Sequence, residues 1–174
     1  MKLEDEMVPY SGPEVPCMAQ DMVHAGVLTE WMENDRLWVP QTATVWFKPC
    51  LLSASNGYFT NILRVRQTGI LSRHRHAGPV HALVLRGRWR YLEHDWVAQE
   101  GGYVYEAPGE THTLVVDEDV EEMITLFQVN GVMVYVDPDG AVLGYEDVFT
   151  KIDACRKHYT TIGLGEDYVD QFIR

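Results

Sequence analysis

The sequence predicts an all-β domain, built as an antiparallel sandwich or barrel, with short additions at both ends. From Thr42 to about Leu143 the chain consists of short runs rich in Val, Thr, Tyr, Trp and Leu, separated by Gly, Pro and Asn. Such runs are typical of many short strands joined by tight turns. A length of 174 residues is enough for one domain with a proper core but not for two large ones. We therefore expect a single all-β domain.

Two turn sequences indicate which strands are neighbours. The Ser-Asn-Gly segment at 55–57 separates the runs 44–52 and 58–67, and Asn-Gly between two such runs is a strong β-hairpin signal. The Asp-Pro-Asp-Gly segment at 137–140 follows the apolar run 132–136. Its residues favour a tight turn, because Pro presets the backbone, Asp bonds nearby N–H groups and Gly adopts positive φ. Both segments predict antiparallel connections.

The two ends of the chain have a different texture. The first forty residues are rich in Pro, Met and acids, and we expect an arm with one short helix within 18–32. After Gly144, Asp147 is a suitable N-cap for a helix whose apolar residues recur every three or four positions: Val148, Ile152, Cys155 and Tyr159. A second short helix is expected over 166–173. The predicted division is an N-terminal arm at 1–40, a barrel at 41–144 and a helical extension at 145–174.

Charge and cysteine content exclude several classes of protein. There are 26 Asp and Glu against 14 Lys and Arg, a net charge of −12, so the field of the protein repels nucleic acid and anionic lipid surfaces. The three cysteines, Cys17, Cys50 and Cys155, are widely spaced and argue against a disulfide framework. No stretch approaches the ~18 apolar residues of a membrane span, and no apolar leader opens the sequence. We expect a cytoplasmic protein without nucleic-acid or membrane partners.

Three histidines form the strongest chemical signal. In a strand, side chains alternate between faces, so His74 and His76 share one face while Arg75 points to the other. His112 follows the turn residues Pro108 and Gly109, which place it on another strand. If the two strands are antiparallel neighbours, three imidazoles converge and form a metal site with open coordination positions.

The spacing of these residues resembles the two motifs of the cupin family. The first motif is matched by Gly69, His74, His76, His81 and Gly87. The second is matched by Gly102, Pro108, Gly109 and His112. The chain departs from the family at one ligand, because His81 stands where cupins usually have a Glu. Whether His81 or a carboxylate acts as a fourth ligand therefore stays open.

Longer stretches resemble the 2,4'-dihydroxyacetophenone dioxygenase family. They cover 89–96, 108–114 and 144–149. The resemblance implies a single cupin barrel of jelly-roll type and a non-haem iron(II) enzyme. Such an enzyme uses O2 to cleave the bond between the carbonyl and hydroxymethyl carbons of 2,4'-dihydroxyacetophenone, giving 4-hydroxybenzoate and formate. The implied partners are a small aromatic α-hydroxyketone and O2. Because a small barrel with an apolar outer face and an extended arm often pairs with a copy of itself, we also expect a homodimer or homotetramer.

The histidine pattern and the family resemblance together predict roles for individual residues. The iron ligands are expected to be His74, His76 and His112. Acid–base or supporting roles are expected for His81 and Glu93, with Glu106 as a further candidate base. Substrate contacts are expected from Trp89, Tyr91, Tyr105 and Glu106.

Two other functions stay open at this point. Histidine ligands suit zinc, iron, nickel and copper alike. Zinc on the same histidines would give a regulatory or sensory cupin without catalysis. Alternatively, a metal-bound water would give a cupin hydrolase or isomerase.

Overall fold

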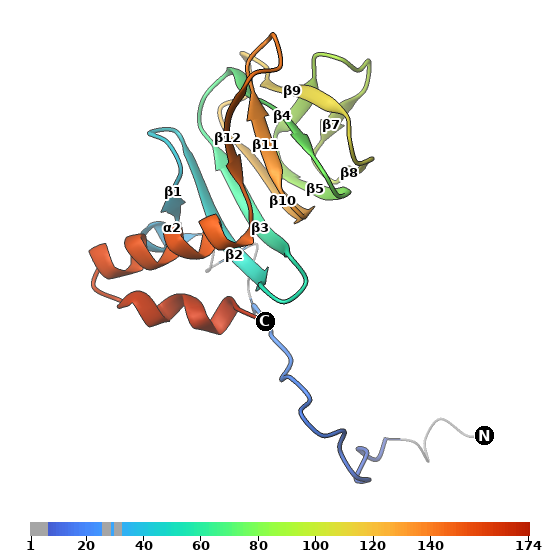
Figure 1. Cartoon of the computed structure of the whole chain (residues 1–174), viewed down its shortest axis with the longest axis vertical. Helices are drawn as coiled ribbons and strands as arrows, with labels where there is room; N and C mark the ends of the chain where they lie inside the picture. The colour runs from blue at the N-terminus through green and yellow to red at the C-terminus, as the bar shows by residue number, and fades with distance from the viewer. Residues whose placement is uncertain (1–6, 26–28, 30–32) are drawn as a thin grey trace, which may run out of the picture.

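The computed structural model describes residues 7–25, 29 and 33–174. Two six-stranded sheets face each other and form a jelly-roll-like barrel (Figure 1). The first sheet runs in the order β1 (Val39–Pro40), β2 (Val45–Ser53), β3 (Tyr58–Val65), β10 (Met123–Asn130), β5 (Val80–Arg86) and β8 (Tyr103–Glu106). The second runs in the order β12 (Val142–Glu146), β11 (Met133–Val136), β4 (Gly69–His76), β9 (Thr111–Val116), β6 (Arg88–Tyr91) and β7 (Val97–Gln99). The all-β prediction is confirmed.

The predicted turns lie where the sequence placed them. β2 and β3 pair as an antiparallel hairpin across the turn at 54–57, where Gly57 takes a φ of +67°. β11 and β12 pair across the turn at 137–140. In that second turn the Asp137 carboxylate accepts hydrogen bonds from the backbone N–H groups of Asp139 and Ala141. The side-chain chemistry of these short segments therefore sets which strands become neighbours.

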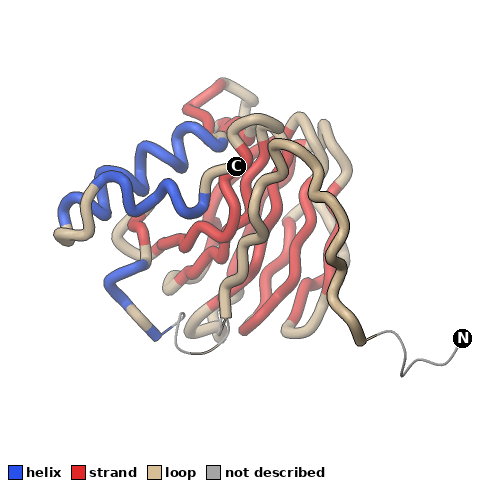
Figure 2. The backbone as a smooth tube through the Cα atoms, turned by 90° about the horizontal axis from the view of Figure 1, so that it is seen from below, coloured by secondary structure: helices blue, strands red, loops and turns tan. Residues whose placement is uncertain are grey.

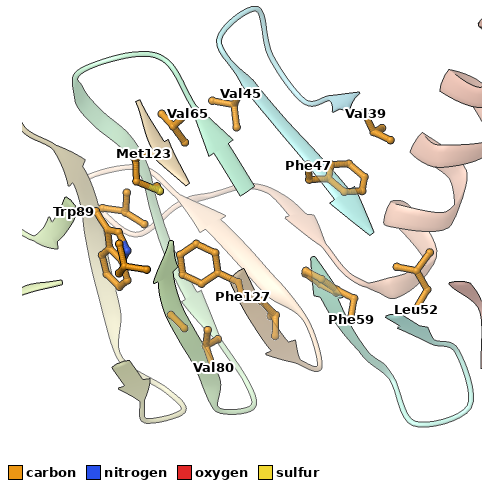
Figure 3. Close-up of a cluster of buried hydrophobic side chains, with 14 of the residues drawn as sticks. Val39, Val45, Phe47, Leu52, Phe59, Val65, Val80, Trp89, Met123 and Phe127 are labelled. Carbon is orange, nitrogen blue, oxygen red and sulfur yellow. The ribbon is translucent and has the colours of Figure 1, made fainter. Parts of the chain in front are cut away.

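The core lies between the two sheets. Figure 3 shows the inward side chains of the first sheet, among them Phe47, Phe59 and Phe127, and Trp89 from the second sheet. Trp89 is completely buried and contacts Phe127 with ring centroids 5.7 Å apart. Because each strand alternates, the residues between these large apolar side chains point outward, and the few polar side chains that point inward stand out.

The C-terminal extension is helical, and both of its helices lie on one side of the strands (Figure 2). They are α2 (Val148–Thr161) and η3 (Glu166–Phe172), and a third short helix, η2 (Asp35–Leu37), precedes β1. Asp147 caps α2 in a reciprocal capping box with Thr150. The predicted apolar face is buried: Val148, Ile152, Cys155 and Tyr159. Among the described residues, no helix has the length and apolar character to cross a membrane.

The last residues of the N-terminal region pair with the first sheet of the barrel. Residues 18–25 are not helical, and the remainder of the expected helix within 18–32 falls mostly on positions outside the described residues. β1 (Val39–Pro40) pairs with β2, so the first sheet begins two residues before the predicted start of the barrel at 41. β12 likewise continues to Glu146.

Candidate metal centre

The three predicted histidines meet inside the barrel. His74 and His76 point inward from β4, and His112 points inward from the adjacent strand β9, where it lies directly opposite His74. The side chains are almost completely removed from solvent, with residue exposures of 4%, 1% and 1%. The Nε2 atoms of His76 and His112 are 3.2 Å apart. Strand alternation and antiparallel pairing thus bring three imidazoles to one point.

A carboxylate completes this group. Glu106, the last residue of β8, reaches across from the opposite sheet, and its Oε2 lies 3.0 Å from His76 Nε2 and 3.6 Å from His112 Nε2. The four residues together offer ligand atoms that all lie within 4.8 Å of one another. From the sequence, Glu106 is expected as a substrate contact or a base, and the identity of any carboxylate ligand stays open. Only the facing of two sheets, which short-range patterns do not encode, places it beside the histidines.

Hydrogen bonds at Nδ1 fix the orientation of two of the three histidine rings, those of His74 and His76. His74 Nδ1 is 3.0 Å from Ser72 Oγ, and His76 Nδ1 is 2.8 Å from the carbonyl oxygen of Gly78. His112 Nδ1 faces Glu110 Oε2 at 4.0 Å. In His74 and His76, where Nδ1 is held by a hydrogen bond, Nε2 is the nitrogen that remains for a metal.

Burial also sets the protonation of two rings. Burial, with smaller effects of His112 and His76, lowers the pKa of His74 to about 3. Burial likewise lowers the pKa of His112. Burial acts in the same direction on His76, but its contacts with Glu106 and the Gly78 carbonyl outweigh that effect and raise its pKa. His74 and His112 are therefore neutral at neutral pH, which is the form that binds metals.

This donor set fits a divalent metal ion. Within the described part of the chain, Glu106 Oε1 and His112 Nδ1 are buried atoms without a hydrogen-bond partner. A buried carboxylate beside three imidazoles is costly unless a cation or donors compensate it. Three imidazole nitrogens and one carboxylate oxygen are ligands that zinc and non-haem iron both accept. The residues present thus match the expectation of a metal site.

A cavity of about 530 Å³ lies beside this group. His74, Tyr91 and Glu106 line one part of it, and apolar side chains form much of its wall: Phe59, Leu63, Leu114, Phe127 and Val129. Its volume is in the range of pockets that enclose small organic ligands. His74, His76, Glu106 and His112, called the metal group below, therefore border a cavity that suits a small, partly apolar molecule.

The family follows from comparison with known proteins. Residues 30–133, more than half of the chain, match the family model described as the ChrR cupin-like domain. The chain belongs to this cupin family. Among curated protein sequences there is no significant match.

Solved structures agree on the cupin fold. An RmlC-like cupin from Ralstonia eutropha is 29% identical, with a TM-score of 0.67 over 71% of this chain and 82% of that protein. An acetylacetone dioxygenase from Acinetobacter johnsonii is 17% identical, with a TM-score of 0.67 over 87% of this chain and 99% of that enzyme. At that identity the second likeness establishes the shared fold alone. The expected cupin barrel is confirmed.

In this cupin, His81 lies away from the three histidines and Glu106, which contradicts the acid–base or supporting role expected for it and the open possibility that it is a ligand. On β5, alternation gives the inner face to Val80 and Ala82, which are buried. His81 points to the outer face, where its Nδ1 is 2.6 Å from the Tyr103 hydroxyl and its ring is 5.3 Å from that of Tyr105. The family motif suggested a ligand at this position, but strand parity decides against it.

Glu93 and two of the expected substrate contacts also lie outside the cavity wall. Both oxygens of Glu93 accept hydrogen bonds from Thr113, one from its N–H at 2.7 Å and one from its hydroxyl at 2.8 Å. Burial opposes these bonds, but they prevail and lower the pKa of Glu93. Tyr105 is exposed on the outer face of β8, and Trp89 belongs to the core. Of the expected substrate contacts, the cavity includes Tyr91 and Glu106.

Proposed function

We propose that this cupin is an iron(II) dioxygenase that cleaves the bond between the carbonyl and hydroxymethyl carbons of a small aromatic α-hydroxyketone. The observation that carries the proposal is the buried group of three histidines and Glu106 bordering a cavity of about 530 Å³. Stretches of sequence resembling the dihydroxyacetophenone dioxygenases support the choice of substrate class. The shared fold with an acetylacetone dioxygenase is compatible with it.

The chain's own residues would contribute binding, orientation and proton transfer. Iron(II) bound by this group would supply a Lewis acid and a place for O2 beside the substrate. The apolar cavity wall would exclude water from the reacting atoms. Glu106 lines the cavity, and its Oε1 has no hydrogen-bond partner among the described residues, so this oxygen would accept the proton of the substrate hydroxyl.

The reaction balances without a further reductant. The substrate 2,4'-dihydroxyacetophenone and O2 together contain the atoms of 4-hydroxybenzoate and formate. The carbon–carbon bond and the O–O bond break, and each product receives one oxygen atom from O2. No external electron donor is required.

An oxygen electrode tests this proposal. Protein loaded with iron(II) under anaerobic conditions should consume equimolar O2 with 2,4'-dihydroxyacetophenone and release 4-hydroxybenzoate and formate. With ¹⁸O2, each product should carry one labelled atom. Arg75→Ala, on the exposed outer side of β4, is the matched control and should keep the activity. If neither this ketone nor related α-hydroxyketones and 1,3-diketones consume oxygen, the enzyme proposal is wrong.

The alternative functions make different predictions in the same assay. A regulatory cupin would bind zinc on the same residues and turn over none of these ketones. A hydrolase or isomerase would be active with zinc and without O2. The donor set alone accommodates each of these metals, so oxygen consumption is the measurement that separates the dioxygenase from both alternatives.

A further inference from the structure

A buried ion pair lies in the wall of the same cavity, apart from the metal group. Lys151, on α2, is 2% exposed, and its Nζ lies 2.8 Å from Oε1 of Glu146 on β12. Both side chains line the cavity. The Lys151 ammonium also lies over two aromatic rings, 3.9 Å from the centroid of Phe47 and 5.2 Å from that of Phe59. The metal group does not use these residues.

Two neighbours connect this pair to the rest of the cavity. The Tyr135 hydroxyl donates to Glu146 Oε2 at 3.3 Å, and its ring centroid is 6.3 Å from that of His74. Gln41 Nε2 donates to Glu146 Oε1 at 2.6 Å. Tyr135 therefore stands between the metal group and the ion pair, and all of these side chains line the same space.

The ion pair and two amides of the cavity wall have hydrogen-bond donors and acceptors that no described residue satisfies. An ammonium has three N–H donors, and within the described part of the chain Glu146 supplies the one oxygen partner of Lys151 Nζ. Gln41 Oε1 is buried and has no partner among the same residues. A second lining amide, Asn61, is 3% exposed and has an unpartnered Oδ1. Unused donors and acceptors in a buried place are costly unless a ligand or water satisfies them.

The charge balance selects the kind of ligand group. Glu146 neutralises Lys151, so a carboxylate placed here would be a buried charge without compensation. A hydroxyl is neutral, and it can accept from the Lys151 ammonium while it donates to the amide oxygen of Gln41. Apolar rings on one side and polar atoms on the other suit a hydroxyl carried by an aromatic ring.

We propose that Gln41, Glu146 and Lys151 form a recognition subsite for a hydroxyl group on the end of the ligand that is remote from the metal. This inference deepens the proposed function, because it assigns the ring hydroxyl of an aromatic ketone to named residues. It concerns binding alone, so it can stand or fall independently of the oxygen chemistry.

Titration calorimetry on the metal-free full chain tests the subsite. The probes are 4-hydroxyacetophenone, acetophenone and 4-acetylbenzoate. The wild-type protein should bind the hydroxyl compound more tightly than the unsubstituted ketone by about tenfold to a hundredfold, the effect of a hydrogen bond to a charged group. The carboxylate compound should bind no better than acetophenone.

Matched variants then locate the preference. Lys151→Met should remove this preference. Lys48→Met should keep it, because Lys48 is a buried lysine that lies on the face of β2 opposite to Phe47 and does not line the cavity. Gln41→Met, at a partly exposed position, serves if Lys151→Met fails to fold, and it should reduce the preference. Equal binding of the hydroxyl and unsubstituted ketones by the wild type, or a full preference in Lys151→Met or in Gln41→Met, overturns the subsite. A hydroxyl preference without oxygen consumption would keep the subsite and refute the proposed reaction.

Discussion

Tyr91 lies flat against the imidazole of His112, with ring centroids 3.7 Å apart and an angle of 7° between the planes. Tyr91 is 1% exposed on β6, the strand beside β9. The stacked ring prevents His112 from rotating about its side-chain bonds. Because a ligand contributes fully only when its orientation is fixed in advance, Tyr91 supports the metal group without contacting it as a ligand.

Removal of the Tyr91 ring should therefore weaken metal binding. Tyr91→Ala should raise the dissociation constant for zinc or iron(II) by about tenfold to a hundredfold, the usual effect of losing a group that orients a ligand. Tyr91→Phe keeps the stacked ring and should bind metal nearly as well as the wild type. Metal titration with a competing chelator measures both. If Tyr91→Ala binds as tightly as Tyr91→Phe, the stacking has no role in binding.

Glu106 should behave as a ligand. Glu106→Gln retains the shape of the side chain but loses the charge that would compensate a cation, so metal affinity should fall while the fold persists. Circular dichroism and the same chelator competition measure fold and affinity. Glu110→Gln is the comparison, because Glu110 lies 4.0 Å from Nδ1 of His112, on the side away from Glu106, and should have the smaller effect. A larger effect of Glu110→Gln would reverse these assignments.

His81 should be dispensable for metal binding. Its ring faces Tyr103 and Tyr105 on the outer side of the first sheet. His81→Ala should keep the full metal content of the wild-type protein, whereas His76→Ala should lose it. Elemental analysis of both purified variants provides the comparison. Loss of metal in His81→Ala would restore the ligand role that the family motif suggested.

An ion cluster at one end of the first sheet should make stability depend on pH. Glu122 binds Arg64, Arg66 and Arg86 at 2.7–2.8 Å. Burial opposes this effect, but the three guanidinium groups prevail and lower the pKa of Glu122. The folded pKa lies below the unfolded value of about 4.3, so the stabilisation is complete above that pH and is lost as the pH falls through the folded pKa.

Glu122→Gln should therefore lower the free energy of unfolding at neutral pH by about 1–3 kcal/mol, and the difference from wild type should shrink under acid conditions. Urea denaturation at several pH values measures it. The neighbouring exposed residue provides a control, since Glu121→Gln should change little. A deficit in Glu122→Gln that does not depend on pH would contradict the role of its charge.

Local patterns predicted the parts of the site that depend on one strand or one turn. Alternation placed His74 and His76 on one face, and Asp147 marked the start of α2 because capping depends on neighbouring residues. The approach of Glu106 to His76 joins two sheets, so no pattern within one strand or turn predicts Glu106 as a ligand. The family motif matches His81 by its spacing along the chain, but the direction of the side chain depends on the parity of β5, which turns it to the outer face.

The ion pair of Glu146 and Lys151 shows the same limit. The helical spacing in the sequence predicted α2 but gave no reason to place a lysine inside the barrel. Lys151 enters the cavity only because α2 packs against β1 and β2. A charge on a predicted helix is ordinarily taken as exposed, so only the packed structure identifies this one as buried.

The central claim is that His74, His76, Glu106 and His112 bind one metal ion. Its most direct test is the iron content per chain after anaerobic loading with iron(II) and desalting, in the wild type, in His112→Ala and in Arg75→Ala. We predict stoichiometric iron in the wild type and in Arg75→Ala, and almost none in His112→Ala. Equal iron in folded His112→Ala and wild type, or no iron or other divalent metal retained by the wild type, would contradict the account.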